Sequence, residues 1–215
     1  SGIVTIAGFL ALQAKHARKL WGNVTGERLW YALHGYDIQT PPSQRGMCGH
    51  GRVLPPGYRT LEQARSASRL LLVKAARRIR RDGWNAGRLW LWLDCRNDTL
   101  NRSAWLPAVH DDQAVLSALE GLWREVRDTA PRDIRIHRLG VALLDLTLAG
   151  QRQLDVFLND DDERRKWESL TDSVDRLNRK YGKTLVSVGE WSPPPGGYAG
   201  GKINDTRIPR VEDFW

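Results

Sequence analysis

Apolar positions recur along the chain with two different periods, and each period predicts a different kind of element. Small and apolar side chains fall three or four positions apart between residues 60 and 82, which predicts an amphipathic helix with arginines off its apolar stripe. Between residues 88 and 95, leucines at every second position alternate with Arg88, Trp90 and Trp92. This alternation predicts a strand with a leucine face and an Arg-Trp face.

The same periods across residues 47–148 predict the order β-α-β-β-α-β, which is the ferredoxin-like arrangement. Strands are expected at residues 47–54, 88–95, 100–106 and 134–148, the last bent at Gly140, and helices at 60–82 and 111–129. The predicted fold class is therefore α+β, a four-stranded antiparallel sheet with two helices on one face. The leucine face should lie buried under the helix at 60–82, which leaves the Arg-Trp face open.

Helical patterns also flank this unit. Short helices are expected at residues 5–12, 14–21 and 26–33, the last capped by Thr25. A charged helix is expected at 160–181, with an apolar stripe of Trp167, Leu170, Val174 and Leu177. The predicted organisation is a helical module at 1–40, a proline-bearing linker at 41–46, the α+β domain at 47–150 and an extension at 151–215.

The charge of the chain is concentrated in one segment. The net charge is +8 and arginine far outnumbers lysine, while residues 45–102 alone hold 13 basic and four acidic side chains. Arginine pairs bidentately with phosphate, so nucleic acid is a better partner than a membrane surface, with a solvated basic surface as the alternative. No run of eighteen apolar residues is present, so no membrane-spanning helix is expected.

The sequence predicts neither a catalytic site nor a metal site. The five histidines are scattered, and no Gly-rich phosphate loop or nucleophile motif occurs. The runs His110-Asp111-Asp112 and Asp160-Asp161-Asp162 stand where helices should begin, and we interpret them as caps. Two cysteines cannot form a disulfide framework, which fits a reducing, cytoplasmic setting.

Three segments are candidates for binding. The Gly-bounded turn at residues 22–28 opens a helix, and its free backbone N–H groups could bind phosphate; the alternative is an ordinary helix-helix turn. The open sheet face should hold Arg88, Trp90 and Trp92, joined by Arg135 and His137 if the strand at 134–148 alternates. Nucleic acid, another protein or the C-terminal helix could cover that face.

The third segment is the run Gln153-Leu154-Asp155-Val156-Phe157, which follows the last predicted strand. Two large apolar side chains beside a glutamine can dock as an extended peptide into a hydrophobic pocket of a partner. The alternative is a short edge strand.

Taken in order, these segments resemble the C-terminal half of Y-family translesion DNA polymerases. The thumb resemblance rests on Gly2–Ile6, Leu20–Gly22, Gly26–Trp30 and Leu33–Gly35; the little-finger resemblance rests on Val53–Pro56, the arginine-rich helix and Arg138–Val141. Gln153–Phe157 is similar to the sliding-clamp-binding pentapeptide of polymerase V catalytic subunits, and Asp175–Leu185 to their C-terminal region. Residues 196–215 resemble polymerase V less well.

The resemblance implies that this region grips primer-template DNA without sequence preference, tethers to the sliding clamp and acts in DNA repair and the SOS response. It implies DNA contacts at Asn23, Thr25, Gly26, Arg28, Arg45, His50, Arg52, Arg88, Trp90, Trp92, Arg135 and His137, and clamp contacts at Gln153, Leu154, Val156 and Phe157. Palm and fingers domains would precede it in the parent chain, and the palm would hold the catalytic Mg²⁺. This chain should need no cofactor, should be inactive alone, and should act at the nucleoid.

Two other functions stay open. The parent could be a non-catalytic polymerase-like accessory protein of the damage response, or the Trp face could dock a protein instead of DNA.

Overall fold

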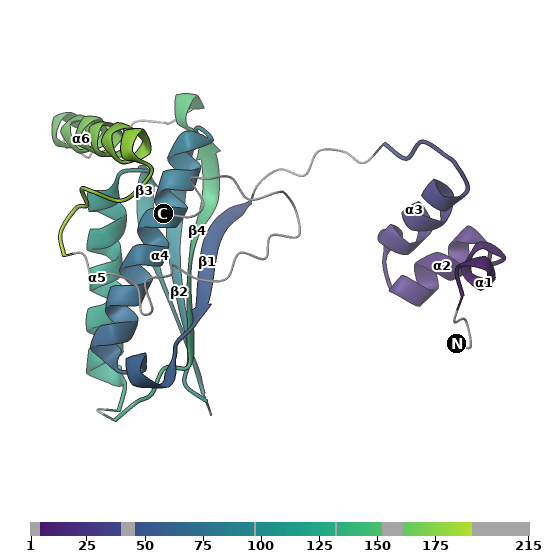
Figure 1. Cartoon of the computed structure of the whole chain (residues 1–215), viewed down its shortest axis with the longest axis horizontal. Coiled ribbons are helices and arrows are strands. Elements are labelled where there is room, and N and C mark those ends of the chain that lie inside the picture. Colours follow the sequence, from purple (N-terminus) through teal and green to yellow (C-terminus); the bar gives the residue numbers. More distant parts are fainter. Residues whose placement is uncertain (1–4, 40–45, 97, 132, 152–160, 191–215) are drawn as a thin grey trace. The chain divides into compact units, whose positions relative to one another are not determined.

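The structure is a computed structural model that describes residues 5–39, 46–96, 98–131, 133–151 and 161–190. The chain divides into two compact units, Ser1–Gln44 and Arg45–Trp215, which are described separately below. Figure 1 labels the elements of both. The finer division predicted from the sequence stays a prediction.

The first unit contains three helices: α1 (Ile6–Leu10), α2 (Ala14–Trp21) and α3 (Val24–Leu33). Thr5 caps α1, because its hydroxyl accepts a hydrogen bond from the Gly8 N–H at 3.1 Å. The predicted start of α3 is wrong by two residues. Asn23, and not Thr25, is the cap, since its side-chain oxygen accepts from the Thr25 N–H at 2.8 Å.

The second unit has the predicted order of strands and helices. Its elements are β1 (Met47–Val53), the 3₁₀ turn η1 (Pro56–Tyr58), α4 (Leu61–Arg81), β2 (Trp84–Asp94), β3 (Thr99–Val109), α5 (Asp112–Thr129), β4 (Arg138–Leu148), η2 (Ala149–Gln151) and α6 (Asp161–Tyr181). The sheet order is β1-β4-β2-β3, with every neighbouring pair antiparallel. The α+β prediction is confirmed, and β1 and β3 are the sheet edges.

Helices α4 and α5 lie on one face of this sheet (Figure 1). A reciprocal capping box of Thr60 and Gln63 starts α4, so the backbone N–H groups of these two residues are satisfied at the first turn. Leu89, Leu91 and Leu93 of β2 are fully buried in the core beneath the helices. The predicted leucine face is therefore the inward face, and the Arg-Trp face points the other way.

Strand β4 begins later than predicted, at Arg138. Residues 134–137 lie outside the sheet, although Ile136 is fully buried and its N–H donates to the Arg59 carbonyl at 2.9 Å. The predicted bend at Gly140 stays a prediction, and no bulge occurs there. The register of β4 runs through Gly140 without a shift on both sides of the strand.

The sheet is irregular near the start of β2 instead. A bulge interrupts the pairing of β2 and β3 between Ala86 and Arg88. Asp145 of β4 and Ala108 of β3, which flank the same level, both have positive φ angles, of 53° and 51°. The bulge shifts the alternation of β2 by one residue. Strict alternation would place Ala86 and Leu89 on opposite faces, but both are buried core residues.

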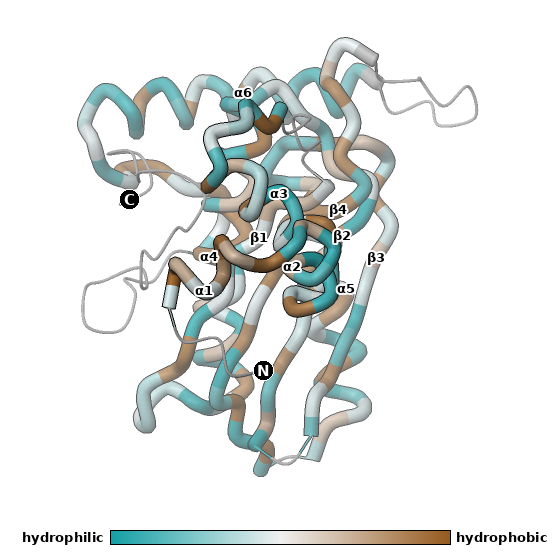
Figure 2. The backbone as a smooth tube through the Cα atoms, turned by 90° about the vertical axis from the view of Figure 1, so that its right-hand side faces the viewer, coloured by the Kyte–Doolittle hydropathy of each residue, from teal (hydrophilic) through white to brown (hydrophobic). Residues whose placement is uncertain are grey.

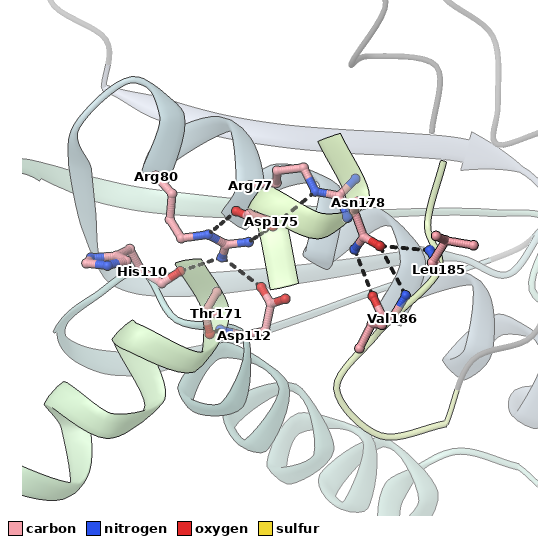
Figure 3. Close-up of polar contacts among 9 residues, drawn as sticks. All are labelled: Arg77, Arg80, His110, Asp112, Thr171, Asp175, Asn178, Leu185 and Val186. Atoms are coloured by element: carbon pink, nitrogen blue, oxygen red, sulfur yellow. Dashed lines mark hydrogen bonds and ion pairs between the residues drawn. The ribbon is translucent and has the colours of Figure 1, made fainter. Parts of the chain in front are cut away.

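Buried polar contacts hold helix α6 against the rest of the second unit (Figure 3). Arg80 of α4 donates to Asp112 of α5 at 2.7 Å and to Asp175 of α6 at 2.8 Å. Arg77 donates to Asp175 at 3.4 Å. These contacts link α4, α5 and α6 through charged groups in place of an apolar seam.

The predicted apolar stripe of α6 is therefore wrong in part. Val174 is buried, but Leu170 and Leu177 are exposed, while Thr171, Asp175 and Asn178 face inward. Asn178 is fully buried, and its amide holds the chain after the helix by accepting from the Leu185 and Val186 N–H groups and donating to the Val186 carbonyl. Figure 2 shows α6 as a largely hydrophilic tube.

Candidate nucleic-acid interface

The open face of the sheet can be mapped from the strand register, because directly paired residues point to the same side. Listed from β1 through β4 and β2 to β3, its four rows are Val53, Arg138, Asp94 and Thr99; Gly51, Gly140, Trp92 and Asn101; Gly49, Ala142, Trp90 and Ser103; and Met47, Leu144, Arg88 and Trp105. The two central rows hold one tryptophan each among small or short polar residues.

Glycines make room for the Trp92 indole. A Cβ built on Gly140 would overlap that ring, with the Trp92 Cε2 atom at 2.6 Å, and a Cβ on Gly51 would lie 3.6 Å from its Cζ2 atom. The indole therefore lies across β4 toward β1. Trp90 and Trp92 are both half-buried, and their β1 and β4 neighbours add no bulk beside them. The centre of the face is a low aromatic surface.

The charges on this face are balanced. Arg88 forms two contacts with the Asp145 carboxylate, at 3.0 and 3.1 Å, and Arg138 lies 3.7 Å from Asp94. Each of these two arginines thus has a carboxylate partner on the adjacent strand. The face offers shape and aromatic surface, with little net charge.

Two basic residues of the first strand lie on the other side of the sheet. His50 pairs with Val141 and Arg52 with Leu139, and both partners are core residues, so His50 and Arg52 point toward the helix-covered face. Partial burial lowers the pKa of Arg52. Their predicted contact with DNA stays a prediction, but it would not be made from the open face.

The placement of Arg135 and His137 on the open face is wrong. Both precede β4, so they do not take part in its alternation. The backbone of His137 instead closes the sheet end, since its N–H donates to the Asp94 carbonyl at 2.7 Å and its carbonyl accepts from the Leu54 N–H at 2.8 Å. Arg45 and the segment Gln153–Phe157, with Leu154 and Val156, lie outside the described residues.

The turn between α2 and α3 has the geometry of a tight helical hairpin. Gly22 has a φ of 71°, a left-handed conformation that suits glycine. Gly26 packs directly on α2, because a Cβ there would overlap the Ala17 carbonyl and lie 2.7 Å from the Trp21 Cβ. Thr25 is exposed and Arg28 is half-buried. The first turn of α3 thus presents backbone N–H groups that have no partner within the helix.

A comparison with protein-family models gives one match, to the impB/mucB/samB family C-terminal domain over residues 45–156. The match spans more than half of the chain. The chain belongs to this family. The resemblance to the C-terminal region of Y-family polymerases is thereby confirmed.

Solved structures resemble the impB/mucB/samB chain only distantly. An insertion ternary complex of Dbh DNA polymerase shares 16% identity with a TM-score of 0.42, over 68% of this chain and 42% of the polymerase. A Y-family polymerase chimera of Dbh and Dpo4 shares 18% identity, with the same TM-score and coverage. The chain thus spans less than half the length of these polymerases. No curated protein matches it.

Several arginines of helix α4 form ion pairs with carboxylates of the same impB/mucB/samB domain. Arg65 and Arg69 bind Glu120 of α5 at 2.8 and 2.7 Å. Partial burial disfavours the charged carboxylate, but the hydrogen bonds from these two arginines outweigh it and lower the pKa of Glu120. The basic segment predicted to favour nucleic acid is therefore partly neutralised by its own fold.

Sequence reasoning missed one residue of the open face. Trp105 of β3 is 80% exposed, and the Arg88 guanidinium lies 5.8 Å from its ring centroid. The predicted strand at 100–106 could have revealed Trp105. Leu100, Ala104 and Leu106 pack against the core, so Trp105, which alternates with them, must lie on the opposite face.

The structure also bears on metal sites and membranes. Within the described ranges, no group of three or more His, Cys, Asp or Glu side chains could hold a metal ion. No described helix is long and apolar enough to cross a membrane.

Proposed function

We propose that this impB/mucB/samB domain grips primer-template DNA without sequence preference, as part of a parent chain that acts in repair and translesion synthesis. The open face of the sheet carries the proposal. In its two central rows, two half-buried indoles lie among glycine, alanine, serine and asparagine, so a duplex can approach the sheet closely there. Grip through shape and backbone would suit an enzyme that must tolerate damaged bases.

The turn between α2 and α3 would add phosphate contacts. Asn23 shapes the start of α3, and the free N–H groups of that helix favour an anion by the same logic as other helix N-termini. Catalysis would belong to a preceding palm domain, whose Mg²⁺ ions would promote nucleotidyl transfer. The fingers domain, the SOS response and a place at the nucleoid are further parts of this proposal.

Charge insertion on the open face tests DNA binding. Asn101 and Ser103 are exposed there, so Asn101→Asp with Ser103→Asp adds two negative charges with little effect on packing. The matched control adds the same charges at two exposed positions of α6, Ser169→Asp with Ser173→Asp. Fluorescence anisotropy with a labelled duplex should give a micromolar Kd for the unchanged chain, falling in affinity as salt rises.

The face variant should weaken duplex binding about tenfold or more, while the α6 control stays within about twofold. Equal loss in both variants would mean that the charges act at long range and that the face is not the contact surface. Full affinity in the face variant would mean that DNA binds another surface of the chain, and it would favour a protein partner for the open face.

We also propose that Gln153–Phe157 tethers the parent chain to the sliding clamp. Leu154 and Phe157 supply apolar anchors and Gln153 a polar one, as in extended peptides that fill a hydrophobic pocket. Leu154→Ala with Phe157→Ala should weaken binding to the clamp of the same organism by about tenfold to a hundredfold. Asp155→Ala is the control and should bind as the unchanged chain does; an equal loss in that control, or no binding by the unchanged chain, refutes the tether.

A further inference from the structure

Trp105 stands apart from the other tryptophans of the open face. Trp90 and Trp92 are half-buried among their neighbours, whereas Trp105 is 80% exposed and lies on the edge strand β3. An indole left this exposed gains little burial energy from its own fold. Its position on the edge strand places the ring at the border of the open face.

The Arg88 guanidinium lies against the Trp105 ring and is held there by a carboxylate. Arg88 pairs directly with Trp105 across the β2–β3 ladder, and its guanidinium lies 5.8 Å from the ring centroid. Asp145 holds that guanidinium with two contacts, at 3.0 and 3.1 Å, on the other side of β2. Since one arginine is tied to a carboxylate and lies against the indole, the Trp105 side chain has a preset orientation.

The surroundings of Trp105 suit a nucleic acid strand. Arg164 of α6 donates to the Pro107 carbonyl at 2.9 Å, two residues beyond Trp105, so a second guanidinium lies near this end of β3. Arginine beside an exposed aromatic ring is the combination that binds single strands, where the cation attracts the backbone and the ring stacks on a base.

We propose that Trp105 is a stacking site for an unpaired nucleobase of single-stranded DNA adjoining the gripped duplex. This inference rests on the proposed DNA grip and adds a ligand to it. A paired base offers only its edge to a protein, because both of its faces are covered by neighbours in the stack. An unpaired base exposes a whole face, which an 80% exposed indole at the sheet edge can meet.

The test compares three DNA ligands of equal duplex length: a blunt duplex, one with a single-stranded overhang, and one whose overhang is abasic. The abasic overhang keeps the phosphates and removes the bases. The variants are Trp105→Ala, Trp105→Phe as the conservative change, and Tyr181→Ala, which removes a ring that is 54% exposed on α6. Circular dichroism and thermal melting check that each variant folds as the unchanged chain does.

The unchanged chain should prefer the overhang to the blunt duplex by about 5-fold to 100-fold, the range for one stacked base. Trp105→Ala and the abasic overhang should each remove that preference, and Trp105→Ala should lower the affinity for the overhang DNA by a larger factor than the affinity for the blunt duplex. Trp105→Phe should keep most of the preference, and Tyr181→Ala all of it.

Other results overturn the proposal in distinguishable ways. Blunt-duplex binding with no preference for the overhang removes the stacking site and leaves the duplex grip standing. An equal loss for blunt and overhang DNA in Trp105→Ala makes Trp105 a duplex contact. A preference that survives on the abasic overhang assigns it to phosphates. No DNA binding by the unchanged chain removes both proposals.

Discussion

Replacing Arg80 with methionine should destabilise the second unit more than any other single arginine change in α4. Arg80 is 4% exposed, and its partner carboxylates of Asp112 and Asp175 are 3% and 9% exposed. Methionine fills much of the same volume but carries no charge and donates no hydrogen bonds. The change therefore leaves Asp112 buried without its hydrogen-bonded cation and removes the donor to the His110 carbonyl.

The expected cost follows from the geometry. Removing one member of a buried ion pair costs about 3–5 kcal/mol, because the remaining charge stays desolvated. Arg77 still lies 3.4 Å from Asp175, so that carboxylate keeps one partner and the cost should fall near the lower end. A small domain is stable by only about 5–15 kcal/mol, so even the lower value is a large fraction.

Urea unfolding followed by circular dichroism measures the effect, with Arg81→Met as the control. Arg81 is the next residue, is 20% exposed and pairs with its neighbour Asp82 at 3.1 Å, so its loss should cost under about 1 kcal/mol. If the two variants unfold at the same urea concentration, the buried network does not hold α6, and the reasoning is refuted.

The same variant has a pH signature. Burial raises the pKa of Asp112, and Arg80 is the strongest opposing influence, so the loss of Arg80 should raise that pKa further. An acid with a raised folded-state pKa destabilises the fold only while it is ionised, and the penalty shrinks as pH falls through that pKa. The stability deficit of Arg80→Met should therefore be smaller at pH 5 than at pH 7. A deficit that grows toward pH 5 would contradict this account.

Two further predictions concern single sites. Gly140→Ala should lower the free energy of unfolding by about 1–3 kcal/mol, because its methyl group would overlap the Trp92 indole; Gly121→Ala in α5, where a Cβ meets nothing within 4 Å, should be neutral or stabilise by about 0.4–1 kcal/mol, and urea unfolding of both compares them. Burial lowers the pKa of His110, so the unfolded chain takes up a proton at a higher pH than the folded one and stability should fall as pH drops from 7 to 5. His110→Asn should flatten that fall; an unchanged slope in urea midpoints would assign it to other groups.

The sheet and its two covering helices could be predicted because local pattern and burial agree. Leu89, Leu91 and Leu93 alternate strictly, and a strand with one buried face has only one register that buries all three. Helix α6 could not be predicted as well. Its apolar residues suggested one face, but the face that packs is polar, because Asp175 meets arginines that are 95 or more residues earlier in the chain. Such partners leave no local signal.

The candidate interface was predictable only in its centre. Trp90 and Trp92 follow from the alternation of β2, whereas the residues beside them depend on which strands are neighbours. The sequence suggested a bend at Gly140 and did not reveal that this glycine leaves space for the Trp92 indole. Arg135 was placed wrongly because apolar and basic residues already alternate at 134–137, before the strand begins at Arg138.

The distribution of charge shows why counting within a window misleads. Residues 45–102 hold the whole positive excess, yet arginines of that window pair with carboxylates outside it: Asp112, Glu120, Glu125, Asp145, Asp175 and Glu190. Much of the excess therefore fixes α5, α6 and the residues after them to α4. The charge on the open face is balanced, so contact there should release few counterions and the salt dependence of DNA binding should come mostly from other surfaces. Arginine abundance alone therefore does not identify the open face, whereas the strand register does.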